Sequence, residues 1–204
     1  MNVIKLGRSK VRVDELLQDA FHNIARRAQA REIRLTLRVP AIMSAVYAEK
    51  ELLRIAIDNL LENALRYCTQ GGSIAVEAEE TDHEILLSVC DDGLPIEEAD
   101  QPYIFDRFMR PTVSAKRRPD GLGLGLYLAN EIIALHAGRI VLSSVAESGN
   151  TFTVHLNKPA LATAPPMLDV RASIAHGVSL IERQIARVML CVGELGQVFQ
   201  RAKF

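Results

Sequence analysis

The stretch Asp120–Leu126, which reads DGLGLGL, decides what kind of domain this sequence encodes. Three glycines alternate with leucines and lead directly into an apolar helical pattern that runs from Leu126 to His136. A glycine backbone can approach a ligand closely, and the free N–H groups at the start of a helix attract an anion. The stretch therefore predicts a phosphate-binding turn, although a flexible turn before an ordinary helix fits these residues equally well.

This stretch differs from the common phosphate loops. A Walker loop needs Lys-Ser or Lys-Thr after its last glycine, whereas Leu126 and Tyr127 follow here. In the dinucleotide-binding fingerprint, Leu126 and Leu128 would occupy places that require glycine. The motifs of eukaryotic-type protein kinases are also missing. We therefore expect a nucleotide lid of another kind.

Composition limits the classes of protein. The chain has 204 residues, 49% of them hydrophobic, and a net charge of −1, which predicts one domain with an appendage and no nucleic-acid partner. Three cysteines without metal spacing indicate reduced thiols. Residues 1–12 contain no apolar run of signal length, and no membrane segment is evident. We expect a cytoplasmic location, although a full-length parent protein could be anchored in a membrane.

Hydrophobic periodicity predicts the order of the elements. Apolar residues recur at helical spacing over 14–30, 48–67 and 126–136. Alternating patterns indicate strands over 35–39, 74–78, 85–89, 139–144 and 151–156. Helices that separate sequential strands need an apolar surface to cover, so we expect helices on one face of a mixed, mostly antiparallel sheet.

The C-terminal part has a different composition. Residues 158–166 are rich in alanine and proline and predict a linker, and residues 174–199 carry an apolar seam with heptad spacing. This pattern predicts an amphipathic helix. The helix either packs on its own domain or serves for self-association or partner binding, and the sequence leaves both alternatives open.

Three further stretches contain polar groups suited to a nucleotide. Within 58–67, amide and basic groups lie beside a buried helical stripe, and an amide oxygen is a suitable ligand for Mg²⁺. Asp91 follows an apolar strand, where a carboxylate could accept a hydrogen bond from the adenine amine. Residues 104–110 place two phenylalanines among arginines. Taken alone, residues 58–67 also fit an ordinary polar helix face, and Asp91 fits an Asp-Gly turn. Residues 104–110 fit core residues beside solvated charges.

Together the four stretches resemble the catalytic and ATP-binding domain of bacterial two-component sensor histidine kinases, in the superfamily that includes gyrase and MutL. Residues 58–67 look like the N box of that family, 91–96 the first glycine box, 104–110 the F box and 120–126 the second glycine box. The resemblance covers about Val13 to Leu156. It implies an α+β fold, a two-layer α/β sandwich of the Bergerat type that holds ATP between a helical layer and a lid, here followed by a C-terminal helix.

The resemblance also implies the site. By position, Asn63 is the Mg²⁺ ligand with Asn59 beside it, Asp91 recognises the adenine amine, and the glycines contact phosphate. No residue is assigned with certainty as catalytic, and the basic run 116–118 is expected to be solvated. The full set expected to bind ATP is Asn59, Asn63, Arg66, Tyr67, Asp91, Gly93, Ile96, Phe108, Arg110, Gly121, Leu122, Gly123, Leu124, Gly125 and Leu126.

Asn59 narrows the expected chemistry, and the sequence departs from the family pattern at Pro95 and in its histidines. Asn59 stands where ATP-hydrolysing relatives carry a glutamate base, and an amide cannot take a proton, so transfer is favoured over hydrolysis. Pro95 stands where the family usually has a glycine, which puts the local geometry of the base pocket in doubt. A recognisable phosphoacceptor is also missing. In the family, the phosphoacceptor histidine lies on a helix before this domain and has an acidic neighbour. None of the five histidines has that setting: His22, His83, His136, His155 and His176.

We therefore expect a histidine kinase ATP-binding domain that uses ATP and Mg²⁺ and phosphorylates a histidine outside the recognisable motifs. Its expected partners are a histidine-containing dimerisation domain and a response regulator, with self-association through 174–199 as a further option. The alternatives are an anti-sigma-type serine kinase and a nucleotide-gated interaction module. The expected organisation is a connector over 1–12, the domain over 13–157, a linker over 158–166 and a helix over 167–204.

Overall fold

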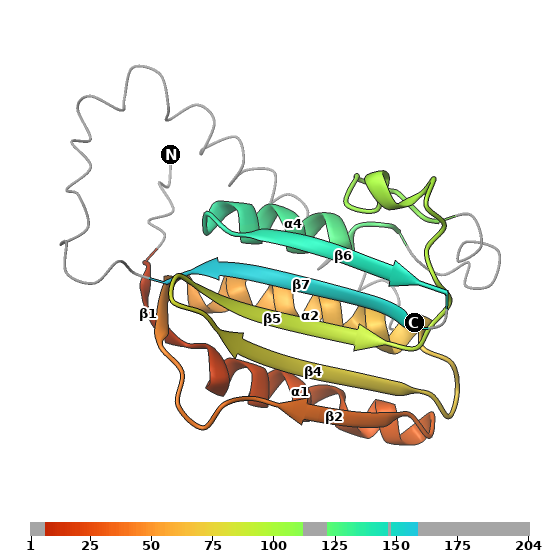
Figure 1. Ribbon diagram of the computed structural model, residues 1–204, viewed down its shortest axis with the longest axis horizontal. Coiled ribbons are helices and arrows are strands. Elements are labelled where there is room, and N and C mark those ends of the chain that lie inside the picture. Colours follow the sequence, from red (N-terminus) through yellow and green to blue (C-terminus); the bar gives the residue numbers. More distant parts are fainter. Residues whose placement is uncertain (1–6, 112–121, 147, 159–204) are drawn as a thin grey trace, which may run out of the picture. The chain divides into compact units, whose positions relative to one another are not determined.

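A five-stranded sheet forms the centre of the part of the chain that this computed structural model describes, residues 7–111, 122–146 and 148–158 (Figure 1). β2 (Arg34–Arg38) pairs in parallel with β4 (Ser73–Glu80), and every other neighbouring pair in this sheet is antiparallel. The mixed, mostly antiparallel sheet that the sequence predicted is thus confirmed. The strand order is β2 (Arg34–Arg38), β4 (Ser73–Glu80), β5 (Glu84–Asp91), β7 (Gly149–Asn157) and β6 (Arg139–Val145).

Three helices cover one face of this sheet: α1 (Val13–Ala30), α2 (Lys50–Tyr67) and α4 (Gly125–Leu135) (Figure 1). Every second residue of β4, β5 and β7 is buried, as expected when one face of a sheet packs against helices. The two-layer sandwich is confirmed. The largest fully buried side chains are Leu16, Leu17, Leu53, Ile57, Leu60, Leu61, Ile74, Ile85, Leu87, Leu128, Ile132 and Phe152.

The C-terminal ends of α1 and α2 are tied together. The chain leaves α1 through Glu32, whose φ is 58°, and the Ile33 N–H donates to the Ala28 carbonyl at 2.9 Å. The Arg31 guanidinium donates to the Leu65 carbonyl and, at 2.7 Å, to the Cys68 carbonyl. Because the last carbonyls of a helix have no partner within the helix, this arginine stabilises the end of α2.

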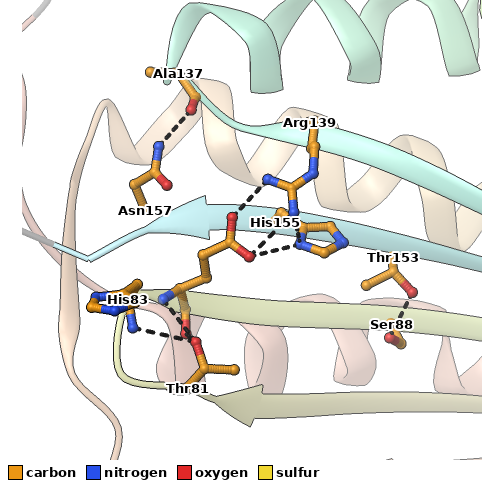
Figure 2. Close-up of polar contacts among 9 residues, drawn as sticks. Thr81, His83, Ser88, Ala137, Arg139, Thr153, His155 and Asn157 are labelled. Carbon is orange, nitrogen blue, oxygen red and sulfur yellow. Dashed lines mark hydrogen bonds and ion pairs between the residues drawn. The ribbon is translucent and has the colours of Figure 1, made fainter.

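The outer face of the sheet carries polar side chains (Figure 2). At the start of β5, a guanidinium nitrogen of Arg139 donates to Glu84 Oε1 at 2.6 Å, and His155 Nδ1 lies 3.0 Å from Glu84 Oε2. In the middle of the strand, the hydroxyls of Ser88 and Thr153 lie 3.0 Å apart. These contacts join β5, β6 and β7 on the face opposite the helices.

A second, two-stranded sheet differs from the expectation. β1 (Ser9–Arg12) pairs antiparallel with β3 (Ala45–Ala48), with Ser9 opposite Ala48. The sequence indicated neither strand, because four residues are too few to show an alternating pattern. The predicted helix over 48–67 consequently starts at Lys50, since Ala48 belongs to β3.

Several expectations lie outside the described residues. They are the C-terminal helix over 167–204, the linker apart from Lys158, the basic run 116–118, and Gly121. Among the helices of the described ranges, none is both long enough and apolar enough to cross a membrane.

Candidate nucleotide-binding site

Asp91 is the last residue of β5 and points into the core side of the sheet. Its side chain is only 3% exposed, in line with the buried Ile85, Leu87 and Val89 of the same strand. Its Oδ1 accepts hydrogen bonds from the Gly93 N–H at 2.9 Å and from Asn150 Nδ2 at 3.1 Å. Burial raises the pKa of Asp91 to about 6, and the hydrogen bond from Asn150 opposes that shift.

The second carboxylate oxygen of Asp91 is an acceptor that the described residues leave open. Within the described part of the chain, Oδ2 is buried and has no hydrogen-bond partner. A buried, unpaired carboxylate oxygen is costly, so this oxygen is suited to accept a hydrogen bond from a group outside the described residues. An exocyclic amine is a donor that would fit.

Gly93 brings the end of β5 against the end of α2. A Cβ on Gly93 would lie 2.5 Å from Asp91 Oδ1 and 2.8 Å from the Tyr67 carbonyl oxygen. Real Cβ atoms do not approach other atoms so closely, so a residue with a side chain would push these segments apart. The first glycine box and the end of the N box are therefore in direct contact.

The N-box helix α2 presents its polar residues beside its buried stripe. Asn59, Asn63 and Tyr67 are half-buried, and Arg66 is exposed. Asn59 Nδ2 donates to the Ile55 carbonyl at 2.8 Å. Its Oδ1 lies 3.0 Å from the point where a Cβ on Gly125 would stand, so this oxygen faces the start of α4.

The F box and the second glycine box form the base of the expected lid. Phe108 and Gly123 both have a φ of 67°, and the Phe108 N–H donates to the Gly123 carbonyl at 3.0 Å. A Cβ on Gly123 would lie 2.6 Å from the Met109 carbonyl oxygen. Leu122 is exposed and Leu124 is buried. The backbones of the F box and the second glycine box are therefore in direct contact.

The structure thus brings both glycine boxes against α2, the helix of the N box, and joins the F box to the second glycine box. The first glycine box contacts α2 at Tyr67, and the second glycine box contacts it at Asn59. Leu126, in the first turn of α4, is half-buried, and so is Arg110. Ile96 stands apart, since its N–H donates to Ser144 Oγ of β6 at 2.8 Å.

Two residues near Asp91 were missed in the sequence. Asn150 is 3% exposed, and Ser144 is half-buried. The sequence did contain a signal for Asn150. This residue lies on the same inward face of β7 as the apolar Phe152 and Val154, two and four positions further along the strand. A polar residue at a core position of a strand calls for a partner, and here the partner is the carboxylate of Asp91.

A metal in this site would depend on few protein ligands. Among residues 7–111, 122–146 and 148–158, no group of three or more His, Cys, Asp or Glu side chains is placed to hold an ion. Mg²⁺ usually takes one or two protein oxygens and completes its shell with water and phosphate oxygens. The amide oxygens of Asn59 and Asn63 fit that kind of site.

Comparison with known proteins shows the family of this chain. A family described as histidine kinase-, DNA gyrase B-, and HSP90-like ATPase matches residues 48–160, more than half of the chain. The adaptive-response sensory kinase SasA of Rippkaea orientalis is 34% identical over 138 residues, which cover 67% of this chain and 35% of SasA. The alginate biosynthesis sensor protein KinB of Pseudomonas aeruginosa is 36% identical over 138 residues, which cover 68% of this chain and 22% of KinB. The chain therefore spans about a third or less of these relatives.

Solved structures share the fold. The catalytic domain of the histidine kinase ThkA superposes with a TM-score of 0.66 at 22% identity, covering 74% of this chain and 95% of that domain. Full-length ShkA in complex with AMPPNP gives a TM-score of 0.67 at 23% identity, covering 79% of this chain and 33% of ShkA. The family match over 48–160 agrees with the fold and with the order of the four motifs. The chain therefore belongs to the family of histidine kinase-, DNA gyrase B- and HSP90-like ATPases.

Proposed function

We propose that this chain is the ATP-binding catalytic domain of a two-component sensor histidine kinase. The observation that carries the proposal is Asp91 Oδ2, a buried acceptor without a partner in the described residues, at the edge where the nucleotide motifs meet. The 6-amino group of adenine supplies the missing donor, whereas guanine would present a carbonyl oxygen there. Domain 13–157 would carry this function, followed by the linker 158–166 and the helix 167–204.

The remaining site residues serve the phosphates in this proposal. Arg66 offers a positive charge on the exposed side of α2, and residues 122–124 of the second glycine box lead into the N-terminus of α4, where free N–H groups favour an anion. Asn63, with Asn59 beside it, would hold Mg²⁺, which neutralises phosphate charge when it is bound. The chain's own part in catalysis is to bind and orient the nucleotide.

The site favours phosphoryl transfer over hydrolysis. Asn59 occupies the place of a general base, but its amide cannot accept a proton, and its Nδ2 is held on the Ile55 carbonyl. The nucleophile is then an imidazole on another segment or polypeptide. A structure of ThkA contains the response regulator protein TrrA. We infer a response regulator as a partner here as well, together with a histidine-containing dimerisation domain.

The first experiment is calorimetric titration of the 204-residue chain with ATP, with and without Mg²⁺. We expect Asp91→Ala to weaken binding in both conditions, because the base contact does not involve the metal. Asn63→Ala should remove the increase in affinity that Mg²⁺ produces. Each loss should be about 10- to 100-fold, the value of a hydrogen bond to a charged group or of a metal ligand.

Matched controls are available on the exposed face of α1. Asn23→Ala and Asp19→Ala remove the same side chains at exposed positions and should leave ATP affinity unchanged. Transfer is then measured with γ-labelled ATP and a dimerisation domain, where an acid-labile label is expected. An acid-stable label, or no ATP binding by the parent chain, would contradict the proposal.

A further inference from the structure

A row of polar side chains crosses the inner face of the sheet at Asp91. The strand registers place Asp91 of β5 opposite Asn150 of β7, and Asn150 opposite Ser144 of β6. The surrounding inner-face positions are apolar, for example Phe152. A buried amide on such a face costs folding free energy unless its groups are hydrogen-bonded, so the partners of Asn150 indicate its role.

Asn150 and Ser144 hold the turn that follows Asp91. Asn150 Nδ2 donates to Asp91 Oδ1 at 3.1 Å and to the Leu94 carbonyl at 3.0 Å. Asn150 Oδ1 accepts from Ser144 Oγ at 2.8 Å, and Ser144 Oγ accepts from the Ile96 N–H at 2.8 Å. The residues on both sides of position 95 are thus fixed by side chains from two other strands.

Pro95 explains why such external support matters. A proline has no N–H to donate and its φ is fixed, so this turn lacks one backbone donor that another residue would provide. The bonds at Leu94 and Ile96 supply anchors on either side of the proline. Side chains from β6 and β7 therefore stabilise the turn that contains Pro95.

The same bonds determine which oxygen of Asp91 meets a ligand. The donors from Gly93 and Asn150 both reach Oδ1, so Oδ2 is left as the acceptor. The hydrogen bond from Asn150 also favours the ionised form of Asp91 and so lowers its pKa. The ionised form is the one that can accept a hydrogen bond from an amine. The other titratable groups that interact with Asp91 are Asp92 on the adjoining turn, the Cys68 thiol after α2 and the Cys90 thiol on β5.

We propose that Asn150 and Ser144 are positioning residues that hold the 94–96 turn and orient Asp91 so that the site selects adenine over guanine. This inference rests on the proposed function and extends it to base selectivity. Neither residue is expected to touch the reacting phosphate. Their substitution should therefore change base discrimination and its pH dependence rather than the contribution of Mg²⁺.

The test is titration of the full chain with ATP and with GTP between pH 5 and 8. The parent should prefer ATP by at least about tenfold. Asn150→Ala should weaken ATP binding roughly tenfold and GTP binding much less, and Ser144→Ala should weaken ATP binding about threefold. In Asn150→Ala, the pH at which ATP affinity reaches half its plateau should rise, because the bond that favours the carboxylate is gone.

Controls separate positioning from loss of the fold. Ser88→Ala removes a hydroxyl from the outer face of β5 and should change neither the ATP-to-GTP ratio nor the pH profile. Asn150→Thr keeps one donor and should retain most of the selectivity, and it replaces Asn150→Ala if that variant fails to fold. Equal losses for ATP and GTP with an unshifted pH profile would overturn this inference alone. Absence of ATP binding by the parent would overturn the proposed function as well.

Discussion

Strand β5 begins with one carboxylate, Glu84, and ends with another, Asp91, and their positions are an odd number of residues apart. They therefore face opposite sides of the sheet. Glu84 lies on the outer face, where Arg139 and His155 occupy both of its oxygens, and hydrogen bonds from these residues lower its pKa to about 2 (Figure 2). Asp91 lies on the inner face, where the described residues leave one of its oxygens unpaired, and its pKa is raised to about 6.

The two ends of β5 contribute differently to stability and binding. The ionised form of Glu84 is more stable in the folded chain than in the unfolded chain, so Glu84 stabilises the fold at neutral pH. The ionised form of Asp91 is less stable when folded, because burial penalises its charge. A ligand that donates to Oδ2 recovers part of that cost. The outer carboxylate thus supports the structure, and the inner one would provide binding energy in the proposed function.

Asp91→Asn should give the largest effects and should move stability and binding in opposite directions. Raising the pKa from 3.8 to about 6 costs about 3 kcal/mol at neutral pH. This penalty is absent below pH 3.8 and complete once the pH exceeds about 6. The variant should therefore unfold at a higher Tm than the ligand-free parent at pH 8, and bind ATP about 10- to 100-fold more weakly.

Thermal unfolding and calorimetry on the same samples test this prediction. At pH 4 the stability gain of Asp91→Asn should largely vanish, because Asp91 of the parent is then protonated when folded. A variant that loses both stability and ATP affinity at pH 8 would show that Asp91 has a structural role instead.

The pH dependence of ATP affinity in the parent should be the next largest effect. Protonation of Asp91 replaces an acceptor with a donor, so affinity should rise as the pH passes about 6 and level off above 7. The change between pH 5 and pH 8 should be about tenfold. Asp91→Asn serves as the reference, because its profile retains only the titration of the nucleotide itself. Coincident profiles would contradict the assignment of Asp91 to the base.

Glu84→Gln should lower stability at neutral pH without changing ATP affinity. The loss should be present above pH 4.5 and should shrink as the pH falls towards about 2, where Glu84 of the parent also becomes protonated. The Tm of parent and variant at pH 7 and at pH 3 measures this effect. A weakened ATP affinity in Glu84→Gln would remove the distinction between the two ends of β5.

Ser88→Ala should give the smallest effect. The hydroxyls of Ser88 and Thr153 form a neutral, partly buried hydrogen bond on the outer face. Its loss should cost about 0.5–1 kcal/mol of unfolding free energy and leave ATP binding unchanged. Denaturant titration measures this cost, and a value above about 2 kcal/mol would mean that the outer face contributes more to stability than its neutral contacts explain.

The sequence predicted the fold because each main element is long enough to show its period. The inward residues of β5 alternate over eight positions, and α2 keeps its apolar stripe over eighteen. By contrast, β1 and β3 have four residues each, and their pairing depends on contacts between distant segments. Asp91 could be proposed as a site residue because its carboxylate follows an apolar strand in a motif of known spacing.

The supporting residues of the site escaped prediction for a physical reason. Asn150 and Ser144 reach Asp91 only through the registers of β5 with β7 and of β7 with β6, which the sequence does not specify. The same holds for Arg31, whose guanidinium caps a helix 34 residues away. Residues of a motif can be recognised locally, whereas the residues that orient them depend on the tertiary structure.

The Cys68 thiol, just after α2, has a consequence for chemical labelling. It is 1% exposed and donates to Asp92 Oδ1 at 3.1 Å, and burial together with this bond raises its pKa to about 12. Alkylating reagents and oxidants attack the thiolate, which is nearly absent here at ordinary pH. Cys68 should therefore react only when the end of α2 opens. Its rate of alkylation, followed by mass spectrometry, would report how often α2 opens at that end.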